Sequence, residues 1–573
     1  MNQSASQGTA PAGSQRLWGA VLGGTLLLFL ARFALSLIRS GPVLVADEIG
    51  YLGNARRIAG GIDAQMELAP FYRSGYSLLI APLLKLSSDP AVQYHLVLAL
   101  NAALAAAVFP LLYLLLTRFA AIPSRVALWA ALAGAVYPAV TVLSQVAMSE
   151  NALFPLVCAW LICFAGLLSN DDNRRSQLLW AIGLGAATGA LWMVHNRMVV
   201  AVVVAVAGMG WLLYRRRIGV AALVAGLAAI ALFVIGTHFL DSFVTDHNYN
   251  GSAPGELTQR MHELFHFSGV RTALANLLGQ SWYLLVATFG LAAVVVADYF
   301  RDRSRRDSET TGAPDPSRPV VAVLLALTAL LLLISASAFP ERTRPDMLIY
   351  GRYAEIVAPA LIAFGIAALA RARVPRAVAW PLAGFAVLTA AVVLIRVTAS
   401  DPDPANRWNI SALPFVTMQL GAAVLIGAMV IALIGAALLR LASSRSTRAL
   451  GLAAVALFGA VVLYGAWNPV RSSERSVYGS GWTSPQAAAE ANGGGAIAYD
   501  LDAYEPIGLY AFQWFLPHSR VVLFHGDREA PPARLVIAGR DFGRDHPGSG
   551  AVEIWSAGER NQSLWRLHDR QAQ

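Results

Sequence analysis

Two adjacent carboxylates, Asp47 and Glu48, follow the first long apolar stretch of the chain. A carboxylate at such a place could take the proton from an attacking hydroxyl group, which is the task of a general base. The pair could also simply begin a helix, because Asp favours helix starts and Glu favours the first turn. The residue types alone leave these two interpretations equally good.

Further polar groups recur at the ends of later apolar stretches, and with two loop histidines they supply the remaining candidates for binding a substrate. Guanidinium groups can hold a phosphate through paired hydrogen bonds, which makes Arg197 and Arg352 candidates for contacting an anionic leaving group. Either arginine could instead anchor the end of a helix at the bilayer surface. The complete set of binding candidates is Arg73, Tyr76, Glu150, Arg197, His262, His266, Arg352 and Tyr353.

The segment His262-Glu-Leu-Phe-His266 matches the pattern in which two histidines one helical turn apart bind zinc and the glutamate activates water. Catalytic zinc needs a third protein ligand, and the next acidic residue, Asp298, lies at the far end of the following apolar stretch. We therefore assign no metal ligands, and expect the two histidines to lie on a loop helix, where they could contact substrate or bind a metal without proteolysis. A zinc metalloprotease stays as an alternative.

The elements that must position these residues are membrane helices. The chain has 573 residues, of which 57% are hydrophobic and only 13% charged, far below the charge of soluble domains. The formal charge of +9 comes as short basic clusters between apolar stretches, a pattern of membrane topology that argues against nucleic acid as a partner. About thirteen stretches are long enough to span a bilayer, near 17–38, 92–117, 125–143, 151–168, 178–195, 198–214, 219–239, 279–300, 319–338, 356–371, 377–397, 414–439 and 449–467.

The basic clusters fall on one side of the membrane if the N-terminus is cytoplasmic. This predicts a multi-pass protein of the cell membrane with a cytoplasmic tail at 1–16, a membrane domain at 17–468 and an extracytoplasmic domain at 469–573. The last part alternates strand-like and helix-like runs, which predicts a small α/β domain. The candidate residues then lie on the extracytoplasmic side, in or beside three long loops.

Four arginines and one short apolar segment need separate interpretation. Arg56 and Arg57 are expected to contact lipid headgroups, and Arg32 and Arg396, inside apolar runs, to reach a membrane interface. Residues 77–84 are apolar but too short to span, so we expect a helix lying at the bilayer surface.

These features follow one another along the chain, on one side of the membrane, in a way that resembles the GT-C glycosyltransferases. These are membrane enzymes that use polyprenyl-phosphate sugars. The family includes protein O-mannosyltransferases and aminoarabinose transferases. The resemblance rests on Asp47-Glu48 after the first span, Gly75-Tyr-Ser-Leu-Leu-Ile-Ala-Pro82, Glu150 between two spans, and Gly351-Arg-Tyr353 before a late span. It implies that Asp47 is the catalytic carboxylate, that Glu48 orients it or the acceptor, and that the acceptor hydroxyl attacks the anomeric carbon.

The implied partners are a polyprenyl-phosphate-linked sugar donor, a glycan, lipid or protein acceptor, and the bilayer. No cofactor is firmly implied, and a divalent metal is left open. A polytopic transporter or lipid flippase is a further alternative. It is disfavoured because no carboxylate lies inside the apolar runs, where ion coupling would need one.

Overall fold

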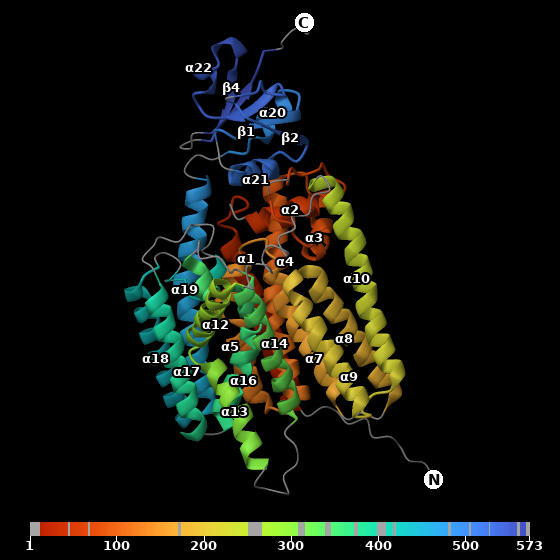
Figure 1. Ribbon diagram of the computed structural model, residues 1–573, viewed down its shortest axis with the longest axis vertical. Coiled ribbons are helices and arrows are strands. Elements are labelled where there is room, and N and C mark those ends of the chain that lie inside the picture. The colour runs from red at the N-terminus through yellow and green to blue at the C-terminus, as the bar shows by residue number, and fades with distance from the viewer. Residues whose placement is uncertain are drawn as a thin grey trace.

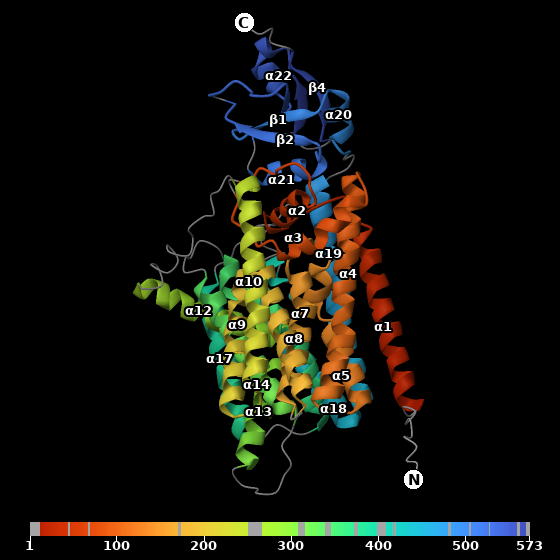
Figure 2. The ribbon, with the colours of Figure 1, turned by 90° about the vertical axis from the view of Figure 1, so that its right-hand side faces the viewer.

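The structure is a computed structural model that describes residues 12–43, 46–66, 69–169, 173–249, 266–306, 316–338, 345–371, 376–397, 408–414, 416, 420–478, 483–503, 506–526, 528–557 and 562–568. In this part of the chain, long helices lie side by side as one bundle, and a small mixed domain sits on one end of it (Figure 1). We call that end the domain end. Helix α1 (Ala12–Ser36) begins at the opposite end of the bundle and runs toward the domain end (Figure 2).

Among the described residues, 10 helices are long and apolar enough to cross a membrane, or up to 12 spans are present if each of two bent pairs counts as one. Their apolar side chains face both the bundle core and its outer surface, as expected of helices solvated by lipid. The ten are α1, α4 (Pro90–Leu114), α7 (Glu150–Leu168), α8 (Arg174–Val194), α9 (Val199–Tyr214), α10 (Val220–Asn248), α14 (Ser317–Ser337), α17 (Arg376–Arg396), α18 (Ala422–Arg445) and α19 (Thr447–Tyr478).

The bent pairs correspond to two of the predicted spans. Helices α12 (Phe267–Ala287) and α13 (Leu291–Arg306) meet at 99°. The segment that holds η4 (Pro345–Ile349) and α15 (Arg352–Glu355) meets α16 (Ala358–Arg371) at 76°. Helix α19 carries the chain past residue 468, where the sequence places the domain boundary.

One predicted span is not a continuous helix. Residues 125–143 form α5 (Ser124–Ala135) and α6 (Pro138–Leu143), with Tyr137 extended between them because the residue before a proline avoids the helical region. The break leaves carbonyl groups at the end of α5 without helical partners. Arg32 of α1 donates to the carbonyl of Ala135 at 2.5 Å and to Thr141 Oγ1 at 3.2 Å. Arg32 is thus paired inside the bundle, and Arg396 is the last residue of α17; that either of them reaches a membrane interface stays a prediction.

The small domain confirms the predicted α/β character. Its sheet has the order β2-β1-β3-β5-β4, in which β1 (Gly495–Asp500) is parallel to both β2 (Ser519–Phe524) and β3 (Leu535–Ala538). Strand β5 (Ser563–Arg566) pairs antiparallel with β3 and with β4 (Val552–Ser556). The sequence predicts strands at 496–499, 520–524, 534–537 and 552–555, and all four are present, whereas β5 was missed. Helices α20 (Gln486–Ala491) and α21 (Pro506–Phe515) match the helical runs predicted at 485–492 and 504–515.

Short helices at the domain end connect the bundle to this domain. Helix α2 (Ala46–Ile58) lies beneath α21, and α3 (Gly75–Ile80) continues into η1 (Ala81–Lys85) below it (Figures 1 and 2). The side chains of Leu78 and Leu79 are exposed, in keeping with the predicted short helix at the bilayer surface.

Arg56 is the principal link between α2 and α21. Its guanidinium donates to the carbonyl of Trp514 at 2.6 Å and to that of Gln513, two groups at the C-terminal end of α21, where a positive charge is favourable. It also lies 5.0 Å from the centre of the Trp514 ring. The expectation that Arg56 contacts lipid headgroups is therefore wrong.

Arg56→Gln is expected to loosen the contact between α21 and α2, because two charge-assisted hydrogen bonds are lost, at a cost of about 2 kcal/mol. Hydrogen–deuterium exchange of the amides of α21 should accelerate roughly tenfold or more. Arg57→Gln is the matched control, since Arg57, in the last turn of α2, pairs with Asp63 in the following loop at 3.1 Å. Equal exchange in both variants would contradict the assigned link.

Candidate active site

The first turn of α2 sends its two carboxylates in different directions. The side chain of Asp47 is 29% exposed and faces Arg352. Glu48 is fully buried, and its Oε1 accepts hydrogen bonds from the Tyr94 hydroxyl at 2.7 Å and from the amide of Ala147 at 2.8 Å. Of the pair, only Asp47 is open to a substrate.

Arg352 joins Asp47 to Glu150. Its Nε donates to Glu150 Oε1 at 2.7 Å, its Nη2 donates to Glu150 Oε2 at 3.1 Å, and its Nη1 donates to Asp47 Oδ2. The Glu150 side chain is fully buried and the Arg352 side chain is 4% exposed. Residues more than three hundred positions apart in sequence thus form one ion-pair network.

Arg197 is the second cation on Glu150. Its Nη2 donates to Glu150 Oε1 at 2.7 Å, and its guanidinium lies 4.2 Å from the centre of the Tyr353 ring. The Nε and Nη1 atoms of Arg197 are buried and have no hydrogen-bond partner among the described residues. A buried guanidinium with two unmatched donors fits an anionic ligand.

Local sequence explains how these side chains meet. Glu150 is the first residue of α7, where the helix dipole favours a negative charge. Gly351 precedes Arg352, and a Cβ atom there would lie 1.9 Å from the Tyr283 ring, so only glycine lets the backbone pass this close. Arg197 lies in the short turn η3 (Asn196–Met198) that joins α8 to α9. Three separate helix ends therefore converge on one carboxylate.

Glu48 ties α2 to the segment that leads into α7. Burial raises the pKa of the Glu48 carboxyl to about 7, although the hydrogen bonds from Ala147 and Tyr94 and the charge of Arg39 act in the opposite direction. Its Oε2 has no hydrogen-bond partner among the described residues. This environment suits a residue that positions Asp47 and Glu150 rather than one that touches substrate.

Glu48→Gln is expected to remove a pH dependence of stability. Since the folded-state pKa of about 7 exceeds the ordinary value of 4.5, the contribution of Glu48 is fully present below pH 4.5 and is lost as pH rises through 7. Wild type should lose roughly 1–3 kcal/mol from this group between pH 5 and pH 8, and the variant should not. Thermal unfolding at both pH values checks this, with Glu490→Gln, an exposed residue of α20, as the control. An unchanged pH dependence in Glu48→Gln would contradict the assignment.

Arg73 lies in a neighbouring groove rather than in the Glu150 network. An open groove of about 540 Å³ runs between one face of α10, the end of α8 and the loop before α3. There Arg73 pairs with Asp241 at 3.3 Å, stacks 4.1 Å from the centre of the Trp192 ring and donates to Asn196, the residue before Arg197. The groove thus adjoins the network. Tyr76 is fully buried and donates to Asn101 Oδ1 at 2.7 Å, a packing role.

The two histidines of the zinc-like motif are only partly covered by the structure. His262 lies outside the described residues. His266 is exposed and directly precedes α12. No group of three or more His, Cys, Asp or Glu side chains that could hold a metal ion occurs in the described part of the chain.

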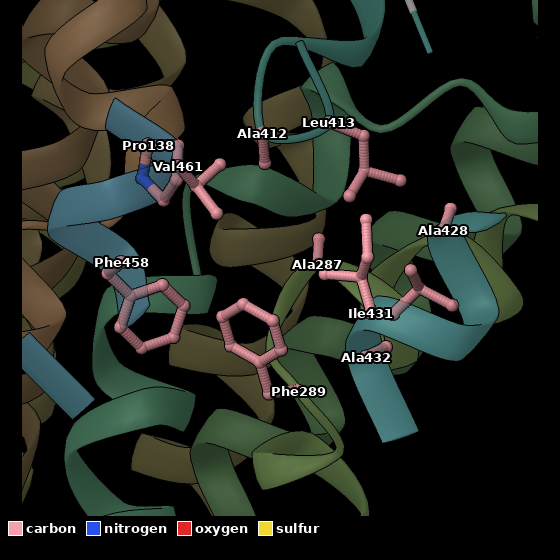
Figure 3. A pocket seen from close by; sticks show the side chains of 11 residues that line it. Pro138, Ala287, Phe289, Ala412, Leu413, Ala428, Ile431, Ala432, Phe458 and Val461 are labelled. Carbon is pink, nitrogen blue, oxygen red and sulfur yellow. The ribbon is translucent and has the colours of Figure 1, made fainter. Parts of the chain in front are cut away.

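One neighbour of Asp47 was not among the predicted site residues. Tyr72 is buried, and burial together with the nearby Asp47 charge raises the pKa of its phenol well above 10. Its place in Phe71-Tyr-Arg73, beside a predicted residue, was the available signal. By contrast, a void of about 10 Å³ between Phe289, Phe458 and Ile431 is lined only by apolar side chains (Figure 3), and has no chemical role.

Comparison with solved structures shows the fold. The chain is similar to the crystal structure of ArnT from Cupriavidus metallidurans bound to undecaprenyl phosphate, with a TM-score of 0.57 and 15% identity over 98% of this chain and 100% of that one. For the apo state of the same protein the TM-score is 0.57, with 14% identity over 97% and 98% of the two chains. No protein-family model and no curated protein matches this chain. The predicted many-spanning helical membrane fold with a small C-terminal α/β domain is confirmed, and it is the fold of ArnT.

Proposed function

We propose that this chain is a membrane glycosyltransferase that moves a sugar from a polyprenyl-phosphate donor to an acceptor hydroxyl on the extracytoplasmic face. The observation that carries the proposal is the network in which Arg352 joins the partly exposed Asp47 to the buried Glu150, with the unmatched donors of Arg197 beside it. The ArnT structure of the same fold supports the lipid class, since it binds undecaprenyl phosphate.

In the proposed reaction, Asp47 takes the proton of the acceptor hydroxyl as its oxygen attacks the anomeric carbon of the donor sugar. The bond between that carbon and the phosphate oxygen breaks, and the phosphate leaves with the electron pair. Arg352 and Arg197 stabilise the charge that develops on the phosphate, because their donors are already oriented in a site with little water. Glu150 holds both guanidinium groups in place, and Glu48 positions α2.

The proposed site lies at the domain end of the bundle, where a lipid phosphate at the membrane surface and an acceptor from the aqueous side could both reach Asp47. The sequence-based topology, with the N-terminus cytoplasmic, places this end outside the cytoplasm. The groove beside Arg73 is the proposed approach for the acceptor, which would be a glycan, lipid or protein.

The proposal is tested by incubating the purified full-length protein with undecaprenyl-phosphate sugars carrying a labelled pentose or hexose, together with membrane extract as acceptor. We expect release of free undecaprenyl phosphate, detected by mass spectrometry, and transfer of the label. Hydrolysis of peptides that is lost in Glu263→Gln but retained in Asp47→Asn would instead support the zinc metalloprotease. Movement of intact labelled lipid between leaflets, with no sugar released, would support a flippase.

A further inference from the structure

Two groups in the proposed reaction approach the same side of the Arg352 guanidinium, the side that carries Nη1. Nε and Nη2 are engaged by Glu150, so Nη1 is the part of the guanidinium that faces away from Glu150. In the structure Nη1 donates to Asp47. A donor phosphate that uses Arg352 approaches the N–H groups that Glu150 leaves unused, which lie on Nη1 and on the outer side of Nη2, and it meets the Asp47 carboxylate there.

We infer that Asp47 occupies the place of the donor phosphate on Arg352, and that binding of the lipid phosphate displaces Asp47 and so frees the base. The inference rests on the proposed function and adds an order to it: donor first, acceptor activation second. Without the lipid phosphate, Oδ2 of Asp47 accepts a hydrogen bond from Nη1 of Arg352, so this oxygen is not available to the acceptor hydroxyl.

The difference in burial between Glu150 and Asp47 determines which of these two partners of Arg352 moves. Glu150 is fully buried and receives three charge-assisted hydrogen bonds, two from Arg352 and one from Arg197. Breaking any one of these hydrogen bonds would leave a buried charge with fewer partners, which is strongly unfavourable. Asp47 is 29% exposed, so water can solvate it when its contact with Nη1 is broken. The phosphate therefore displaces Asp47, while Arg352 and Glu150 stay fixed.

The charges that change in the transfer step balance within the site. Two cations, Arg197 and Arg352, face two anions, Asp47 and Glu150, so the network is neutral before the donor arrives. In the transfer step Asp47 becomes neutral by taking the acceptor proton, while the phosphate gains one negative charge as the bond to the sugar breaks. The net charge around Arg352 is unchanged by that step, so no charge has to be solvated from outside the site.

The test is a binding titration of undecaprenyl phosphate against the full-length protein in nanodiscs, with undecaprenol as the lipid that lacks the phosphate. Asp47→Asn removes the competing charge and should bind undecaprenyl phosphate roughly tenfold more tightly than wild type, the factor expected when one charge-assisted competitor for a donor is lost. Undecaprenol affinity should not change. Asp63→Asn, which removes a carboxylate paired with Arg57 in the loop after α2, is the matched control and should bind like wild type.

The same substitution in a second variant distinguishes competition for Arg352 from simple electrostatic repulsion between Asp47 and the phosphate. In Arg352→Gln, where the buried Glu150 keeps its ion pair with Arg197, adding Asp47→Asn should no longer tighten binding. Tightening that persists there would show long-range repulsion and overturn the inference. Unchanged or weaker binding by Asp47→Asn alone would also overturn it, while leaving the proposed function standing. If wild type does not distinguish undecaprenyl phosphate from undecaprenol, the inference and the proposed function both fail.

Discussion

Asp47→Asn is expected to lower sugar transfer by about a thousandfold, because the amide cannot take the proton of the acceptor hydroxyl. The side chain keeps its shape and can still accept a hydrogen bond from Arg352, so the protein should fold and insert normally. The rate of label transfer, compared with the thermal unfolding midpoint of the same preparation, measures both parts of this expectation.

The matched control for Asp47→Asn is Asp63→Asn, which changes the same atoms on a carboxylate outside the Glu150 network. Its transfer rate should equal that of wild type. Near-normal transfer by Asp47→Asn would remove Asp47 as the base. Loss of transfer with a greatly lowered unfolding midpoint would instead assign Asp47 a structural role.

Arg352→Leu is expected to have the largest effect on stability. It leaves the fully buried Glu150 carboxylate with Arg197 as its one remaining cation in the network, at a cost of about 3–5 kcal/mol, and it removes a proposed phosphate contact. Thermal unfolding should therefore shift sharply downward and transfer should be lost.

Glu150→Gln/Arg352→Gln separates these two effects of Arg352. Because it removes the cation together with the carboxylate that Arg352→Leu leaves underpaired, it should recover part of the stability but none of the transfer, while the buried Arg197 loses its carboxylate. Arg371→Gln is the surface control, since Arg371 is 32% exposed, pairs with Asp298 at 3.4 Å and should contribute little to stability. Full activity in the double variant would contradict the proposed role of Arg352.

The sequence predicted the helices well where the surrounding lipid determines the structure. Apolar stretches longer than the bilayer core must be helices, so nearly every predicted span has a helical counterpart. It was also informative for the network, because Glu150, Arg197 and Arg352 lie at predicted helix ends on one side. Because these helix ends are predicted on the same side of the membrane, the three side chains can meet near that surface. The structure brings all three together with Asp47.

Other features depend on partners that no local pattern reveals. From the sequence alone, Arg32 cannot be distinguished from an arginine near a bilayer surface. Its partner, the carbonyl of Ala135, is available only because the helix breaks before Pro138. Arg56 likewise finds its partners in α21, far along the chain. Glu48 and Tyr76 differ from Asp47 in the direction of their side chains, which depends on packing across several helices. The membrane orientation and the roles of the site residues stay predictions.

The most direct measurement is an experimental structure of the full-length protein with undecaprenyl phosphate bound. We predict that the phosphate contacts Nη1 of Arg352 and the unmatched donors of Arg197, with the Asp47 carboxylate released toward the position of the sugar. A phosphate bound away from both arginines, with the contact between Arg352 and Asp47 intact, would contradict it.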